Sequence, residues 1–256
     1  MVRPSYTKAA GGLRLRLAAL AGAAALAGLQ SPTLAQEFSP PVENVEWTWA
    51  DKPAQLAPDL PNVLLVGDSI SRAYATPLRC LLRERANVFL FATSASVGDD
   101  RLADQLFEAG ALWRARFSVV HLNNGLHGAQ ISDARFASGY PDLIGSLRHL
   151  APDAAIIIAT STPVRDAGGE GLSNARVIER NTAAVAVATL QGLPIDDQYA
   201  LMTEHSDLHV DDIHYDAAGA ALQALQAAQT IVAALPAERR ETATKGSWPS
   251  CEAAPG

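Results

Sequence analysis

Residues 63–74 read VLLVGDSISRAY, and this stretch decides the fold. A run of four apolar residues ends abruptly in Gly67-Asp68-Ser69, and apolar residues at helical spacing follow. A short apolar run that stops at turn residues predicts a buried strand, and the later spacing predicts a helix. Asp68 and Ser69 both favour the N-cap of a helix, which is one interpretation of the triplet. The other is that Ser69 is a nucleophile held at the edge of a sheet.

The same strand-then-helix pattern recurs along the chain. Short apolar runs predict strands at 63–67, 87–92, 117–122, 154–160 and 193–197. Helical patterns fall between or after them, at 71–85, 100–114, 138–150, 173–191 and 216–234. Continuous apolar runs separated by helices are typical of a parallel sheet covered on both faces. We therefore expect a three-layer α/β/α sandwich around a mainly parallel five-stranded sheet.

The first 35 residues have the pattern of a signal peptide. A basic start precedes the 13-residue apolar run LAALAGAAALAGL (17–29), and Thr33 and Ala35 then stand at the −3 and −1 positions of a small-residue cleavage site. This layout is typical of a secretory signal peptide, and the apolar run is shorter than the ~20 residues of a membrane span. We expect cleavage after Ala35, a secreted or periplasmic protein, and no membrane span in the mature chain.

The remaining chain divides into three parts. Residues 36–61 are rich in proline and predict an irregular lead-in, 62–236 the folded domain, and 237–256 an irregular polar tail. Cys80 lies in the first predicted helix and Cys251 in the tail. In an oxidising compartment the two could pair, or both could stay free thiols, because sequence does not show distance. The net charge of −7 argues against a nucleic-acid partner.

Polar residues follow the predicted strands. In a parallel sheet, ligands bind beyond the carboxyl ends of the strands, so these segments are the candidate site. They are Gly67-Asp68-Ser69, SASVGDD (94–100), NNGLHG (123–128) and, after the fifth strand, VDDIHYD (210–216).

Two of these segments resemble motifs of the SGNH (GDSL-type) hydrolase superfamily. GDSIS (67–71) places Ser69 in the nucleophile position, and Asp211-Asp212-Ile213-His214 matches the Asp-x-x-His block just before the last helix. The resemblance implies that His214 is the general base and later the general acid. It also implies that Asp211 orients and stabilises the imidazole, as in other Ser-His-Asp systems. Asp212 is a close competitor for Asp211.

The resemblance also implies an oxyanion hole. Its expected donors are the backbone N–H of Ser69, the backbone N–H of Gly98 and an asparagine side chain. The usual Gly-x-Asn-Asp block is replaced here by Asn-x-Gly-Leu-His (123–127), which looks like a subgroup of the superfamily. On that match Asn123 is the donor and Asn124 the second choice. The plain alternative is that both asparagines are turn residues and that Gly98 serves backbone geometry.

The resemblance implies a flavodoxin-like fold and a serine esterase that hydrolyses carboxylic esters through an acyl-serine intermediate. The N-terminal pattern adds the expectation that this esterase is exported. The expected substrate is a small-molecule or carbohydrate ester, with a short acyl group such as a carbohydrate O-acetyl favoured. No cofactor-binding or metal-ligating residue is assigned. The alternative is a catalytically weak or inactive protein of this fold that binds glycans or transfers acyl groups. The sequence leaves the natural ester, its acyl chain length and the oligomeric state open.

Overall fold

The computed structural model describes residues 44–165, 172–243 and 247–251, so the predicted signal peptide lies outside the described residues. The strands are β1 (Thr48–Asp51), β2 (Asn62–Gly67), β3 (Asn87–Thr93), β4 (Val119–Leu122), β5 (Ala155–Ala159) and β6 (Ile195–Asp196). The helices are α1 (Ser69–Leu82), α2 (Arg101–Trp113), α3 (Asp133–Leu150), α4 (Asn174–Gln191), α5 (Gln198–Thr203), α6 (Ala217–Ala234) and α7 (Ala237–Ala243), with a 3₁₀ turn at Ser206–Leu208.

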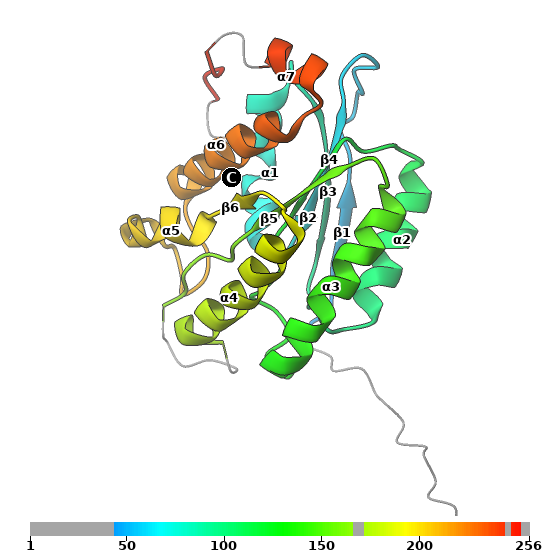
Figure 1. Ribbon diagram of the computed structural model, residues 1–256. Coiled ribbons are helices and arrows are strands. Elements are labelled where there is room, and N and C mark those ends of the chain that lie inside the picture. The colour runs from blue at the N-terminus through cyan, green and yellow to red at the C-terminus, as the bar shows by residue number, and fades with distance from the viewer. Residues whose placement is uncertain (1–43, 166–171, 244–246, 252–256) are drawn as a thin grey trace, which may run out of the picture. The chain divides into compact units, whose positions relative to one another are not determined.

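The predicted three-layer α/β fold is confirmed (Figure 1). The strands form one sheet in the order β1-β3-β2-β4-β5-β6. Strands β2 to β6 are parallel, which is the five-stranded sheet expected from the sequence. Because consecutive parallel strands need crossover connections, helices cover both faces.

The prediction that 36–61 and 237–256 are wholly irregular is wrong in two places. Residues 48–51 form β1, which pairs antiparallel with β3 and makes a sixth strand at the sheet edge. Their sequence, TWAD, has no continuous apolar run, because a strand at the sheet edge need not be buried on both of its faces. Residues 237–243 form the short helix α7.

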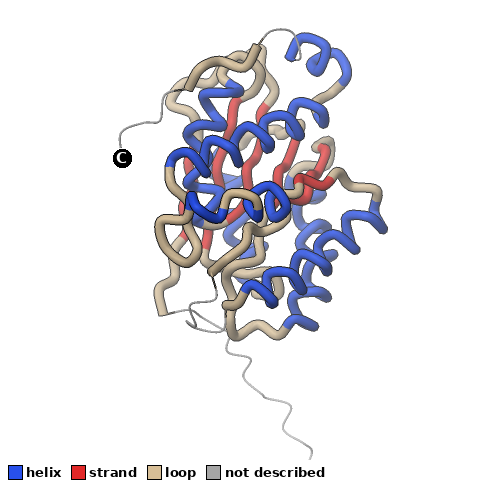
Figure 2. The backbone as a smooth tube through the Cα atoms, turned by 90° about the vertical axis from the view of Figure 1, so that its left-hand side faces the viewer, coloured by secondary structure: helices blue, strands red, loops and turns tan. Residues whose placement is uncertain are grey.

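Two apolar cores flank the sheet. Helices α1 and α6 pack together on one face, and α2 and α3 cover the other (Figure 1). Figure 2 views the molecule from the side on which α6 lies, so that helices on this side stand in front of the strands. Helix α6 has three fully buried alanines in this core, and these small side chains allow α1 to approach closely: Ala224, Ala227 and Ala228. Within the described residues, no helix combines the length and the apolar character that crossing a membrane requires.

A disulfide bond joins Cys80 of α1 to Cys251, which settles the alternative that the sequence left open. The bond spans 171 residues and fixes the C-terminal segment against the domain. Trp248 packs against the core beneath α1, and the guanidinium carbon of Arg85 lies 4.7 Å from the centre of its indole ring. The segment is thus held by a covalent bond and by apolar and cation–π contacts.

Candidate active site

The turn between β2 and α1 presents Ser69 at the carboxyl edge of the sheet. Strand β2 ends at Gly67, and Asp68 caps α1 by accepting a hydrogen bond from the N–H of Ile70 at 2.9 Å. A side chain at position 67 would place its Cβ 2.0 Å from the hydroxyl of Ser71, so the tight turn requires glycine here. Asp68 is buried and Ser69 is partly exposed. The capping interpretation therefore applies to Asp68, and Ser69 is left partly exposed at the start of α1.

Three side chains from two distant segments of the sequence meet at this edge. The Oγ of Ser69 lies 2.8 Å from Nε2 of His214, although the two residues are 145 positions apart. The Nδ1 of His214 lies 2.8 Å from Oδ2 of Asp211. Both distances are in hydrogen-bonding range, so the chain Ser69–His214–Asp211 is continuous. An imidazole held in this way can take a proton from the serine hydroxyl and return it to a leaving group.

The segment after the 3₁₀ turn fixes the carboxylate of Asp211. Its Oδ1 accepts hydrogen bonds from the backbone N–H groups of Ile213 at 2.7 Å and His214 at 2.6 Å. The hydrogen bond from the His214 backbone N–H, together with those from the Ile213 backbone N–H and the His214 ring, lowers the pKa of Asp211 to about 2, although burial opposes this shift. Asp211 is therefore ionised at neutral pH and holds a proton on Nδ1 of the ring.

Of the two neighbouring aspartates, the geometry favours Asp211 as the partner of His214. Asp211 contacts the imidazole, whereas the backbone carbonyl of Asp212 accepts a hydrogen bond from the N–H of Arg165 at 2.8 Å. Asp216, one residue past Tyr215, caps α6 by accepting from the N–H groups of Ala218 and Gly219, each at 2.9 Å. The segment is anchored on both sides of His214.

Asp68 brings a second carboxylate close to the site. Burial raises its pKa, against the opposing charges of His127 and His214 and the hydrogen bonds from the α1 backbone. Its Oδ2 has no hydrogen-bond partner among the described residues. A buried carboxylate with one unsatisfied oxygen costs stability when it ionises.

Asn123 and Asn124 follow β4 and point to different partners. The Nδ2 of Asn123 donates to the carbonyl of Ala159 at 3.0 Å and to the Oγ of Ser161 at 3.3 Å, which uses both of its protons. This geometry argues against Asn123, the first choice from the sequence, as an oxyanion donor. Asn124 donates one proton to the carbonyl of Ala95 at 2.9 Å, and its second proton has no partner within the described chain.

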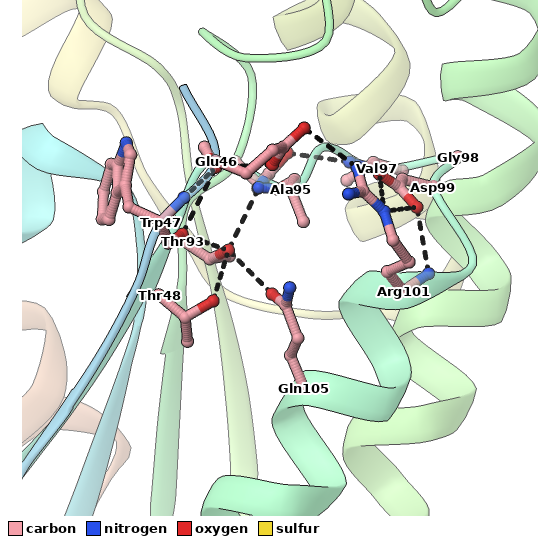
Figure 3. Close-up of polar contacts among 12 residues, drawn as sticks. Glu46, Trp47, Thr48, Thr93, Ala95, Val97, Gly98, Asp99, Arg101 and Gln105 are labelled. Atoms are coloured by element: carbon pink, nitrogen blue, oxygen red, sulfur yellow. Dashed lines mark hydrogen bonds and ion pairs between the residues drawn. The ribbon is translucent and has the colours of Figure 1, made fainter. Parts of the chain in front are cut away.

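Gly98 lies in a loop that is held by many polar contacts (Figure 3). Its φ is +90°, a conformation that favours glycine, and its backbone packs closely on Gly139 of α3. A Cβ at position 139 would lie 2.8 Å from the nitrogen of Gly98. The Oδ1 of Asn124 accepts from the N–H of Val97 at 2.9 Å, so the loop after β3 is tied to the loop after β4. The backbone-geometry interpretation of Gly98 thus has direct support, while its donor role stays a prediction.

No pattern in the sequence pointed to the side chains that hold this loop. The Oγ of Ser94 donates to Glu46 at 2.8 Å, and Thr93 lies 2.8 Å from the amide oxygen of Gln105 (Figure 3). Arg101 forms ion pairs with Asp99 and, at 3.2 Å, with Glu46. Glu46 lies 55 positions before Arg101, in the segment that we expected to be irregular, so no local spacing links the two. Charge patterns reveal such pairs only within one helix or strand.

Comparison with known proteins gives structural neighbours only. No family model matches the sequence, and no curated protein does. A lipolytic protein of the G-D-S-L family from Veillonella parvula is 19% identical, with a TM-score of 0.51 over 66% of this chain and 96% of that one.

Two further structural neighbours are enzymes whose names refer to acetyl groups on polysaccharides. An acetylxylan esterase from Geobacillus stearothermophilus is 14% identical, with a TM-score of 0.54 over 67% of this chain and 94% of that one. The C-terminal catalytic domain of peptidoglycan O-acetyltransferase A from Streptococcus pneumoniae is 18% identical, with a TM-score of 0.52 over 68% of this chain and 94% of that one. Similarity at this level concerns the backbone arrangement. The chain has the fold of the SGNH (GDSL-type) hydrolases.

Proposed function

We propose that this protein is a serine esterase that hydrolyses carboxylic esters through an acyl-serine intermediate. The observation that carries the proposal is the continuous chain from Ser69 through His214 to Asp211, with 2.8 Å at both links. A glycan-binding protein without catalytic activity would have no need of this alignment. The nucleophile, the base and the group that orients the base are all supplied by this chain.

In the first half of the reaction, the Oγ of Ser69 attacks the acyl carbon and its proton passes to Nε2 of His214. The carbonyl electrons move to the acyl oxygen, which becomes an oxyanion. Asp211 stabilises the imidazolium without taking its proton, in line with its lowered pKa. When the oxyanion collapses, the alcohol leaves with the proton from His214. Water repeats the sequence on the acyl-serine and releases the acid.

The oxyanion needs donors aimed at it, and each one typically contributes ~10²–10³ in turnover. We propose the backbone N–H of Ser69 as the first donor, because the attacking residue's own amide lies beside the reacting carbon. The backbone N–H of Gly98 and the second amide proton of Asn124 are the other proposed donors. Asn124 takes precedence over Asn123 here because both amide protons of Asn123 have acceptors.

We propose a short acyl group on a carbohydrate as the substrate class. The names of the structural neighbours support this class, since they include acetylxylan esterases and an O-acetyltransferase. Purified protein should hydrolyse p-nitrophenyl acetate faster than the butyrate and octanoate, and should release acetate from acetylated xylan. Ser69→Ala should abolish these activities. Equal, low rates for wild type and Ser69→Ala on every ester would refute the proposal.

Acyl transfer is the second candidate, supported by the likeness to the peptidoglycan O-acetyltransferase domain. The same acyl-serine would then react with a sugar hydroxyl instead of water. Adding xylo- or chito-oligosaccharides to the p-nitrophenyl acetate assay separates the two. An esterase yields acetate at an unchanged ratio to p-nitrophenol, and a transferase yields acetylated sugar at the expense of acetate.

We further propose that the protein is exported. The basic and apolar N-terminal pattern supports export, and so does the Cys80–Cys251 bond, because disulfides persist mainly in oxidising compartments. N-terminal sequencing of the protein from a periplasmic or culture fraction should give a start at Gln36. A mature protein that retains Met1 or Val2 would contradict cleavage.

A further inference from the structure

A fully buried arginine supports the loop that follows β4. Arg180 of α4 is 1% exposed. Its Nη1 donates to the carbonyl of Gly125 at 3.0 Å and to that of His127, and its Nη2 donates to the carbonyl of Gly128 at 2.7 Å. A buried charge is tolerated only where it is hydrogen-bonded or paired. Beyond these three loop carbonyls, the carbonyl of Ile131 lies 3.5 Å from Nη2, and the carboxylate of Asp133 lies 3.8 Å from Nε. One guanidinium therefore sets the direction of the peptide groups between Gly125 and Gly128.

The loop that Arg180 holds lies between the two apolar cores of the protein. The guanidinium carbon of Arg180 lies 4.8 Å from the ring centre of Phe136, which belongs to the core beneath α2 and α3. Leu126 belongs to the other core, beneath α1 and α6. Ser69 is the first residue of α1, and His214 lies just before α6. Figure 1 shows these two pairs of helices on opposite sides of the sheet. The loop thus crosses between the two faces.

The loop also borders the turn that carries Ser69. A Cβ at Gly67, two residues before the nucleophile, would lie 3.4 Å from the carbonyl oxygen of Asn123. A Cβ at Gly125 would lie 2.3 Å from the hydroxyl of Ser161. These short distances place the backbone of Asn123 next to the carboxyl end of β2, and that of Gly125 next to Ser161, which follows β5.

Peptide geometry then fixes where one donor points. The chain has no cis peptide bond among its described residues, and in a trans peptide the C=O and the following N–H point in opposite directions. Because the carbonyl of Gly125 points at Arg180, the N–H of Leu126 points away from it. That N–H has no hydrogen-bond partner within the described part of the chain. An unpaired amide in this loop, whose Asn123 carbonyl borders the turn that carries Ser69, is available to an oxyanion.

We propose that Arg180 is a positioning residue that aims the backbone N–H of Leu126 at the oxyanion formed when Ser69 attacks an ester. The inference rests on the proposed esterase function. It gives the loop 123–128 a role that the side chain of Asn123, committed to Ala159 and Ser161, does not fill. Arg180 touches no reacting atom and acts only through the peptide between Gly125 and Leu126.

The first test compares Arg180→Lys with Arg176→Lys. Arg176 lies one turn earlier in α4, and its guanidinium donates to the carbonyls of Ala129 and Ile131, further along the same loop. We expect Arg180→Lys to lower kcat for p-nitrophenyl acetate by ~10²–10³ with little change in KM, the loss typical of one oxyanion donor. Arg176→Lys should stay within about threefold of wild type, since a backbone donor at Leu126 does not depend on it.

Two readouts distinguish positioning from general loosening. The inhibition constant of phenylboronic acid, which mimics the tetrahedral intermediate, should rise in Arg180→Lys in parallel with the loss of kcat. The pH profile of kcat should keep its wild-type shape, because Ser69, His214 and Asp211 are untouched. A shifted profile, or weaker product binding to the same extent as boronate binding, would overturn the proposal.

A second variant decides the matter if Arg180→Lys fails to fold. Replacing Leu126 by its α-hydroxy acid through nonsense suppression exchanges the N–H for an oxygen and keeps the side chain. This variant should lose ~10²–10³ in kcat, whereas Leu126→Ala, which keeps the N–H, should not. Wild-type turnover in the α-hydroxy acid variant would overturn the inference alone. Absence of ester hydrolysis in the wild type would overturn the proposed function and the inference with it.

Discussion

Replacing Asp211 by asparagine separates the carboxylate's structural role from its chemical one. In Asp211→Asn, the amide oxygen can still accept the two backbone N–H groups that Oδ1 accepts now, so the turn before α6 is kept. The new NH₂ group would then face Nδ1 of His214, which would have to accept that hydrogen bond. The ring proton would move to Nε2, the atom 2.8 Å from the Oγ of Ser69, and the base would be lost.

The expected size of the loss follows from the exposure of the pair. In a buried triad this exchange costs ~10⁴ in turnover. The Asp211 side chain is 54% exposed, so water can partly replace it, and we expect a fall of ~10³ in kcat, or about 4 kcal/mol. Asp212→Asn is the matched control and should keep wild-type kcat. The assay is initial-rate hydrolysis of p-nitrophenyl acetate, with circular dichroism to show that each variant is folded. Equal losses in Asp211→Asn and Asp212→Asn, or full activity in Asp211→Asn, would refute the reasoning.

Three further predictions concern stability. Asp68→Asn keeps the cap of α1 and removes a buried carboxylate of raised pKa, so this variant should become more stable than wild type as pH rises above ~4. Asp68→Ala loses the cap and should lower the free energy of urea unfolding by ~1 kcal/mol. An asparagine variant that is less stable than the alanine variant would contradict this prediction. Converting Cys80 and Cys251 to alanine should lower Tm and reduce the free energy of unfolding by up to ~5 kcal/mol, because the bond spans 171 residues. The variant should keep its kcat at 25 °C, because Cys80 lies near the end of α1 that is far from Ser69, and a loss of kcat in the folded variant would refute this prediction. Burial raises the pKa of Asp196, but the 2.7 Å hydrogen bond to His121 and the hydrogen bonds from glutamine side chains lower this pKa overall. The stabilisation from Asp196 should therefore be present above pH ~4 and lost as the pH falls further. Asp196→Ala should cost ~3–5 kcal/mol of unfolding free energy at pH 7, and a loss under about 1 kcal/mol would contradict the pairing with His121.

The parallel sheet could be predicted because its strands are buried on both faces. Continuous apolar runs such as 63–66 have few other interpretations when turn residues bound them. Strand β1 escaped prediction because an edge strand is defined by its partner, here β3, and not by its own composition. The same applies to the Cys80–Cys251 bond, whose partners only the fold brings together.

The catalytic candidates were predictable to the extent that short motifs carry them. Asp211 and His214 belong to one local turn, and Ser69 to another, so each motif survives in the sequence. The oxyanion side of the site has no such local signature. Whether Asn123 or Asn124 faces the site depends on which acceptors neighbouring strands present, and the role of Arg180 depends on a helix more than 50 positions away from the loop.

The central claim is that His214 activates Ser69 as a nucleophile. The most direct measurement is mass spectrometry of the intact protein after reaction with phenylmethylsulfonyl fluoride, followed by peptide mapping. We predict one sulfonyl group per chain, attached to Ser69, and no labelling of His214→Ala over the same time. Labelling at another serine, or labelling of Ser69 at the same rate in His214→Ala, would contradict the account.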